Sequence, residues 1–178
     1  MIILGMTRVC EIILILSIVA LWGNGLEAIG LDLQRVFFGL KKGLIWSFGF
    51  GILAFLASLA LFLAGVDPFP LIRMPMNSGL NRFLVLILIG GILAPIAEEV
   101  FFRGVLYGFF RRWGLITAVI MSTLLFVLVH PLGQSIPLIQ IVGGILFAVA
   151  YEVEGSLVAP ITIHALGNCT LFTISYFA

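Results

Sequence analysis

Long apolar runs, separated by short clusters of polar residues, dominate the pattern of this chain. Most runs approach the roughly 20 residues that a helix needs to cross a bilayer. The pattern predicts an all-α fold: a polytopic transmembrane helical bundle of about six spans, forming a single transmembrane domain over residues 1–178. The predicted spans are Val9–Trp22, Leu44–Val66, Phe83–Arg112, Leu115–His130, Ile136–Tyr151 and Leu157–Phe177.

The third span is predicted to be one long helix, although the charged segment Glu98–Arg103 interrupts its apolar pattern. Pro95 cannot donate a hydrogen bond to the carbonyl of Gly91, so the helix should kink or open one turn before this segment. Such a break makes room for water inside a protein at membrane depth.

The composition agrees with a membrane location. Of 178 residues, 62% are hydrophobic and 10% are charged, whereas a soluble domain carries about 25% charged residues. The chain therefore cannot cover itself with a polar surface, and the lipid bilayer is its expected surrounding. A net charge of +1 and the lack of a basic tract predict no nucleic-acid partner. Cys10 and Cys169 match no metal spacing.

The N-terminal region admits two interpretations. Arg8 followed by the apolar run Ile12–Trp22 could belong to a signal peptide, but no small-x-small cleavage site follows, and Glu11 stands at the start of the run. An uncleaved first span is therefore favoured. The segment Val36–Lys42, before the second span, is predicted to lie along the membrane interface.

The distribution of basic residues predicts the orientation, because cytoplasmic loops carry an excess of lysine and arginine. With six spans, two groups of basic residues fall on opposite sides of the membrane. The larger group is Arg35, Lys41, Lys42, Arg111 and Arg112, with Arg103 if it is counted, and the smaller is Arg8, Arg73 and Arg82. The larger group should be cytoplasmic, which places both termini outside.

A few polar residues lie within spans, where they cost several kcal/mol and persist mainly at functional sites or in paired networks. They are Glu98, Glu99, Arg103, His130, His164 and Asn168. A helical rise of about 1.5 Å per residue places four of them at similar depths, roughly 14–24 Å from one membrane face. These four are Glu98, His130, His164 and Asn168. We therefore expect them to meet inside the bilayer.

The spacing of these residues suggests contacts along each helix. Glu99 and Arg103 are four residues apart, the offset of an ion pair, which could be structural or could orient an active site. Phe126 shares a helix face with His130, as His164 does with Asn168. Glu152 and Glu154, in contrast, stand at the end of the fifth span and are predicted to be solvated loop charges rather than substrate contacts.

The polar set is suited to hydrolysis. The chain shows neither a recognisable Ser-His-Asp arrangement nor an H-E-x-x-H zinc pattern. A carboxylate held away from bulk water can act as a general base on water near neutral pH, with a neighbouring histidine positioning that water. A second histidine and an asparagine amide could donate to the oxyanion formed on a peptide carbonyl. Two other functions stay open: a proton-coupled transporter that uses the same buried charges, and a non-proteolytic immunity or scaffold protein that keeps the fold and does not depend on Glu98 or His130.

Three motifs together resemble those of the CAAX protease and bacteriocin-processing family of intramembrane endopeptidases, also called the abortive-infection family. They are E-E-x-x-x-R at Glu98–Arg103, F-x-x-x-H at Phe126–His130 and H-x-x-x-N at His164–Asn168. The resemblance covers residues 83–178, which would form the catalytic helices. It implies a glutamate-type endopeptidase acting on a membrane-associated peptide or protein, near its C-terminus, and a location in the prokaryotic plasma membrane.

The resemblance also implies a role for each motif residue. Glu98 activates water, His130 works beside it, and His164 and Asn168 stabilise the transition state. Glu99 and Arg103 orient the site, and Phe126 packs under His130. No cofactor is expected, with zinc as the alternative. CAAX proteins, bacteriocin precursors and sorting signals are all compatible substrates.

Overall fold

The computed structural model describes residues 2–72, 79–130 and 137–177, in which the regular elements are helices and no strand occurs. The prediction of an all-α fold is therefore confirmed. The main helical segments are α1 (Ile2–Trp22), α2 (Val36–Leu63), the continuous segment Leu80–Arg111, α7 (Leu115–Leu128), α8 (Leu138–Glu154) and α9 (Val158–Phe177). Shorter helices are η1 (Leu26–Ile29), η2 (Leu33–Arg35) and α3 (Phe69–Ile72).

Each of the six predicted spans corresponds to one of these main segments. Four segments are long and apolar enough to cross a membrane: Ile2–Trp22, Leu33–Leu63, Leu80–Arg111 and Val158–Phe177. Helix α7 is a shorter apolar helix of 14 residues, and α8 has 17. At about 1.5 Å per residue, α7 extends roughly 21 Å, less than the thickness of a hydrocarbon core. Two positions used in the predictions, Arg73 and Ile136, lie outside the described residues.

The prediction of a separate interfacial segment at Val36–Lys42 is wrong, because these residues form the first two turns of α2. No proline interrupts residues 36–63, so the helix continues through them. Two glycines, Gly39 and Gly43, are buried in this part of α2. A Cβ atom at Gly43 would lie 2.5 Å from Cβ of Thr162 on α9, which shows how closely the two helices approach.

The long helix Leu80–Arg111 is irregular at two places. It consists of α4 (Leu80–Leu86), the π-helical segment η3 (Ile87–Leu93), α5 (Ala94–Glu99), the π-helical segment η4 (Val100–Tyr107) and α6 (Gly108–Arg111). Pro95 stands just after η3, so the predicted opening of the helix before Glu98 is confirmed as a widened turn. π-helical turns are rare and occur frequently at functional sites.

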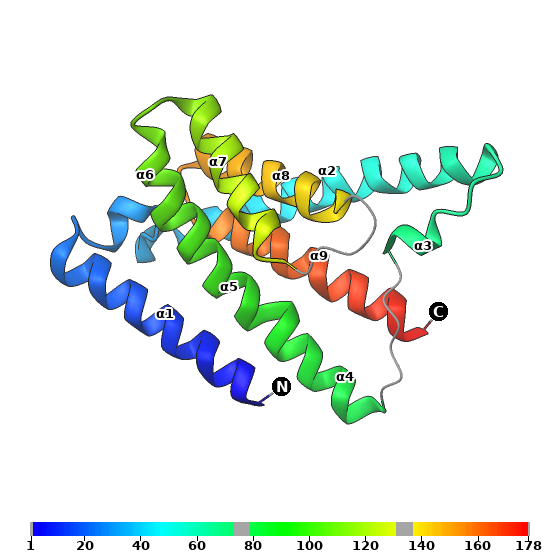
Figure 1. Ribbon diagram of the computed structural model, residues 1–178, viewed down its shortest axis with the longest axis horizontal. Helices are drawn as coiled ribbons and strands as arrows, with labels where there is room; N and C mark the ends of the chain where they lie inside the picture. The colour runs from blue at the N-terminus through cyan, green and yellow to red at the C-terminus, as the bar shows by residue number, and fades with distance from the viewer. Residues whose placement is uncertain (1, 73–78, 131–136, 178) are drawn as a thin grey trace.

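This long helix lies between α1 and α9 and organises the bundle (Figure 1). Helix α9 also packs against α2 and α8, and α7 packs against α8 and η4. The buried cluster Phe102, Phe126, Phe147, Ala150 and Ile163 fills the space where η4, α7, α8 and α9 meet. Many leucine, isoleucine and phenylalanine side chains on α1 and α2 are exposed, as expected of helices that face lipid.

Candidate active site

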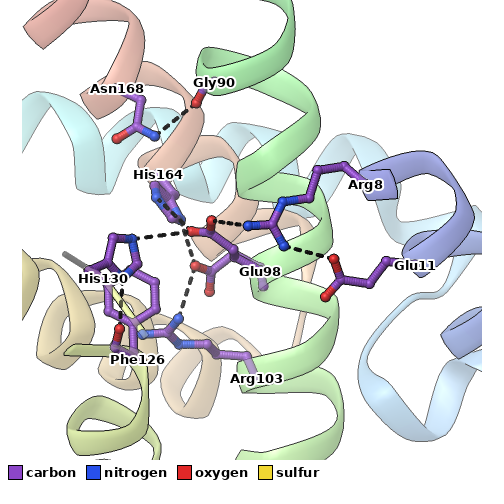
Figure 2. A network of polar contacts seen from close by, with 10 residues as sticks. Arg8, Glu11, Gly90, Glu98, Arg103, Phe126, His130, His164 and Asn168 are labelled. Atoms are coloured by element: carbon purple, nitrogen blue, oxygen red, sulfur yellow. Dashed lines mark hydrogen bonds and ion pairs between the residues drawn. The ribbon is translucent and has the colours of Figure 1, made fainter. Parts of the chain in front are cut away.

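One oxygen of the Glu98 carboxylate faces two histidines, which belong to different segments of the chain (Figure 2). Its Oε2 atom is 3.8 Å from Nε2 of His130, just past the end of α7, and 3.7 Å from Nε2 of His164 on α9. The exposed fraction of the Glu98 side chain is 12%. Both separations are longer than a direct hydrogen bond. The predicted meeting of Glu98, His130 and His164 is thus present in the structure.

Each imidazole is held through its other nitrogen. His164 Nδ1 lies 2.7 Å from Glu99 Oε1, and His130 Nδ1 lies 2.7 Å from the backbone carbonyl oxygen of Phe126. A carboxylate and a carbonyl oxygen can only accept, so we assign the hydrogen to Nδ1 in both rings. Both Nε2 atoms are therefore directed at Glu98.

Glu99 forms the predicted ion pair with Arg103, and both side chains are completely buried. Arg103 Nη1 donates to Glu99 Oε1 at 3.0 Å, and Nη2 donates to the carbonyl oxygen of Gly144 at 2.9 Å. Within the described part of the chain, Glu99 Oε2 and Arg103 Nε have no hydrogen-bond partner. Because Glu99 Oε1 also contacts His164, this pair connects η4 and α8 to the imidazole.

Aromatic rings enclose the two histidines. The Phe126 ring centroid is 4.5 Å from that of His130, as expected from the F-x-x-x-H motif. Phe147 of α8 stacks on His164 with centroids 4.5 Å apart and an interplanar angle of 19°. The sequence interpretation missed Phe147, since nothing in its local pattern distinguishes it from other lipid-facing or core phenylalanines.

Asn168 lies one turn further along α9 than His164, but its side chain forms a hydrogen bond with the long helix Leu80–Arg111. Its Nδ2 atom donates to the backbone carbonyl oxygen of Gly90 in η3, at 3.0 Å. Figure 2 shows this contact on the other side of His164 from Arg103. The amide is therefore near the polar cluster, but it donates to the backbone and not to Glu98 or a histidine.

Arg8 of α1 is a member of the cluster that sequence reasoning missed. Its Nη2 atom is 3.4 Å from Glu98 Oε1, and its Nη1 atom donates to Glu11 Oε2 at 2.7 Å. Arg8 approaches the carboxylate from α1, away from both imidazoles (Figure 2). The signal in the sequence was an Arg–Glu pair three residues apart, just before the apolar run Ile12–Trp22. We counted Arg8 among the basic residues outside the spans, whereas it lies within α1.

The prediction that Glu152 and Glu154 are solvated loop charges is wrong for Glu154. Its side chain is 8% exposed, accepts a hydrogen bond from Trp46 Nε1 at 2.9 Å and pairs with Lys42 Nζ at 3.2 Å. Glu152 forms an exposed ion pair with Arg111 at 2.8 Å. Both glutamates lie in the last turn of α8, where Glu154 connects this helix to α2 and Glu152 connects it to α6.

Zinc, the alternative cofactor, can be compared with the donors that are present. Among residues 2–72, 79–130 and 137–177, no group of three or more His, Cys, Asp or Glu side chains could hold a metal ion. The arrangement of Glu98, His130 and His164 therefore does not fit a metal site in this structure, and no step below passes through a metal.

These features define a class of protein: an integral membrane helical bundle with a carboxylate and two histidines gathered inside it. A comparison with protein-family models matches residues 80–170 to the family described as Type II CAAX prenyl endopeptidase Rce1-like. The match covers just over half of the chain and includes all three motifs, so the chain belongs to this family. Comparisons with curated proteins and with solved structures gave no match.

Proposed function

We propose that this protein is an intramembrane endopeptidase that hydrolyses a peptide bond near the C-terminus of a membrane-associated peptide or protein. Membership of a CAAX endopeptidase family supports this at the level of the family. The observation that carries the proposal is the placement of one largely buried carboxylate within 3.8 Å of two imidazole nitrogens, one from the end of α7 and one from α9.

In the proposed first step, a water molecule between Glu98 and His130 adds to the substrate carbonyl. Glu98 accepts a proton from the water as the carbon–oxygen bond forms, and His130 Nε2 accepts its second hydrogen bond and fixes its direction. The carbonyl oxygen becomes an oxyanion. His164 Nε2 can donate to this oxyanion in the form of the ring that carries hydrogen on both nitrogens.

In the second step, the tetrahedral intermediate breaks down. The carbon–nitrogen bond breaks, and Glu98 returns the proton to the departing amine, which leaves a carboxyl group on the N-terminal product. No co-reactant other than water is needed. The prediction that Asn168 is a second donor to the oxyanion stays a prediction, because its Nδ2 atom donates to Gly90 in this structure.

The remaining polar residues have supporting roles in this proposal. Glu99 holds His164 through Nδ1, and Arg103 fixes Glu99 by its ion pair and by its bond to α8. A carboxylate that accepts a hydrogen bond from one ring nitrogen restricts the orientation of an imidazole and selects its tautomer. Arg8 holds the opposite oxygen of the Glu98 carboxylate.

The sharpest test replaces the proposed base by its isostere. Glu98→Gln keeps the size of the side chain but removes its ability to accept a proton, so cleavage should fall by at least about 100-fold. The measurement is mass spectrometry of membrane peptides from cells that carry either form, together with cleavage of a farnesylated peptide by purified protein. Glu27→Gln, at an exposed position of η1, is the matched control and should cleave normally.

The alternatives give different outcomes in the same experiment. If folded Glu98→Gln cleaves as well as the unmodified protein, Glu98 is not the base. If neither form yields a new peptide but the unmodified protein moves a solute into proteoliposomes in a pH-dependent way, the transporter hypothesis replaces the peptidase. Each assay is repeated with a zinc chelator, and activity that is lost and then restored by zinc alone would contradict the metal-free proposal.

A further inference from the structure

Two neighbouring residues of α9 contact two neighbouring carbonyl groups of the long helix, just before the proposed base. Asn168 Nδ2 donates to the Gly90 carbonyl oxygen at 3.0 Å, and Cys169 Sγ lies 3.7 Å from the Gly91 carbonyl oxygen. Both carbonyls belong to η3, and Figure 2 shows the Asn168 contact above the carboxylate cluster.

The register of η3 explains why the Gly90 carbonyl needs a donor from elsewhere. A π-helix pairs each carbonyl with the N–H five residues later, and the N–H of Ala94 indeed donates to the Ile89 carbonyl. The next donor in this series would be the N–H of residue 95, directed at Gly90. Residue 95 is a proline and has no N–H. Asn168 donates to this same carbonyl.

The packing of the two helices is adapted to this contact. A Cβ atom at Gly90 would lie 3.0 Å from Cε2 of Phe172, and one at Gly91 would lie 2.7 Å from Sγ of Cys169. Larger residues at either position would push α9 away from η3. The glycines therefore allow the short amide side chain of Asn168 to reach the backbone.

We infer that Asn168 is a positioning residue, which supplies the hydrogen bond that Pro95 cannot make and so holds the widened turn in front of Glu98. If the backbone hydrogen bonds of η3 changed from the five-residue spacing of a π-helix to the four-residue spacing of an α-helix, α5 would rotate by about 100° relative to α4. Helix α5 carries Glu98. Helix α4 is itself held to α9 by the stacked rings of Phe83 and Tyr176, with centroids 4.3 Å apart. Only the consequence for cleavage rests on the proposed function.

The inference predicts that a donor restored at position 95 makes Asn168 dispensable. Four forms of the full-length protein are compared in detergent: unmodified, Asn168→Ala, Pro95→Ala, and the double variant. When position 95 is the natural proline, Asn168→Ala should lower Tm by about 2–6 °C and speed amide hydrogen exchange in residues 87–97. In the Pro95→Ala background, the same change should lower Tm by less than half as much. Thr170→Ala, an exposed polar position on α9, is the control and should change neither.

Cleavage by the same four forms separates this inference from the peptidase proposal. A role in positioning predicts that Pro95→Ala recovers at least part of the activity lost in Asn168→Ala. If Asn168→Ala removes cleavage but leaves Tm and exchange unchanged, and Pro95→Ala restores nothing, Asn168 is a donor to the oxyanion and the inference is wrong. If Pro95→Ala does not fold, Asn168→Leu is used instead. It keeps about the size of the side chain but cannot donate to the Gly90 carbonyl, and exchange no faster than in the unmodified protein would contradict the inference.

Because Tm and hydrogen exchange need no substrate, the inference can hold even if the protein proves not to be a peptidase.

Discussion

At the scale of single residues, two guanidinium groups pair with three carboxylates in and beside the candidate site. Arg8 pairs with Glu11 and Glu98, and Arg103 pairs with Glu99. Arg103 is the most demanding of them, since a buried charge left without its partner costs about 3–5 kcal/mol. Its ion pair with Glu99 is also the support of His164. The structural and the orienting interpretations of this pair therefore describe the same contacts.

The contact of Arg8 with Glu98 leads to a prediction about catalysis. Arg8→Gln removes the cation that holds the carboxylate on the side of α1, so kcat for peptide cleavage should fall about 10-fold with little change in KM. Arg8→Lys keeps the charge and should recover part of the loss. The control is Arg82→Gln, at an exposed position of α4. An unchanged kcat in Arg8→Gln would show that Glu98 is positioned without Arg8.

At the scale of the elements, the long helix Leu80–Arg111 combines regular turns with two widened ones. The segments η3 and η4 stand on either side of α5, which carries both glutamates. Glu98 and Glu99 both lie in the regular turns of α5, where consecutive side chains point about 100° apart. Glu98 therefore faces His130 and His164, while Glu99 contacts Arg103 and His164.

Close approach of α2 to α9 gives a prediction about stability. Leucine at Gly43 would place its Cβ atom 2.5 Å from Thr162 Cβ and 2.8 Å from the Ala159 carbonyl oxygen, and a backbone atom cannot easily move. Gly43→Leu should therefore destabilise the protein by about 1–3 kcal/mol, measured as a lower Tm in detergent. Gly51→Leu, in the same helix with no atom within 4 Å of its Cβ, is the matched control. Equal Tm values for the two variants would contradict the packing of α2 on α9.

At the scale of the whole molecule, basic residues near one end of the bundle pair with the end of α8. Lys42 and Arg111, from α2 and α6, reach Glu154 and Glu152 respectively. These contacts place the start of α2, the end of α6 and the end of α8 on one side of the bundle. Lys42 and Arg111 were also assigned to one side of the membrane when the orientation was predicted. Acidic residues contribute little to the positive-inside rule, so their presence does not alter that prediction.

We therefore propose that both termini lie outside the plasma membrane and that the loop at Gly114 is cytoplasmic. Epitope tags are inserted separately at the C-terminus and after Trp113 of the full-length protein. The cells are treated so that protease reaches the outer face of the plasma membrane while this membrane stays sealed. Added protease should then remove the C-terminal tag and leave the loop tag. The reverse pattern would show that the protein has the opposite orientation.

The main helical segments, their order and the meeting of Glu98 with two histidines could be predicted from the sequence, because each depends on local patterns. Runs of about 20 apolar residues specify spans whatever their neighbours are, and helical rise converts a position in a motif into a depth. Glu98, His130 and His164 were placed together in this way. The ion pair of Glu99 with Arg103 and the contact of Phe126 with His130 followed from spacing within one helix.

Contacts between helices depended on the tertiary structure. A helix such as α1 is apolar on nearly every side, so its sequence does not indicate which face meets the bundle, and the approach of Arg8 to Glu98 could not be foreseen. The bond of Asn168 to Gly90 depends on the register of η3 and on the distance between two helices. The bond of Glu99 to His164 depends on how α9 is rotated. Such contacts join residues 65 to 90 positions apart, and only the packing of the folded chain decides them.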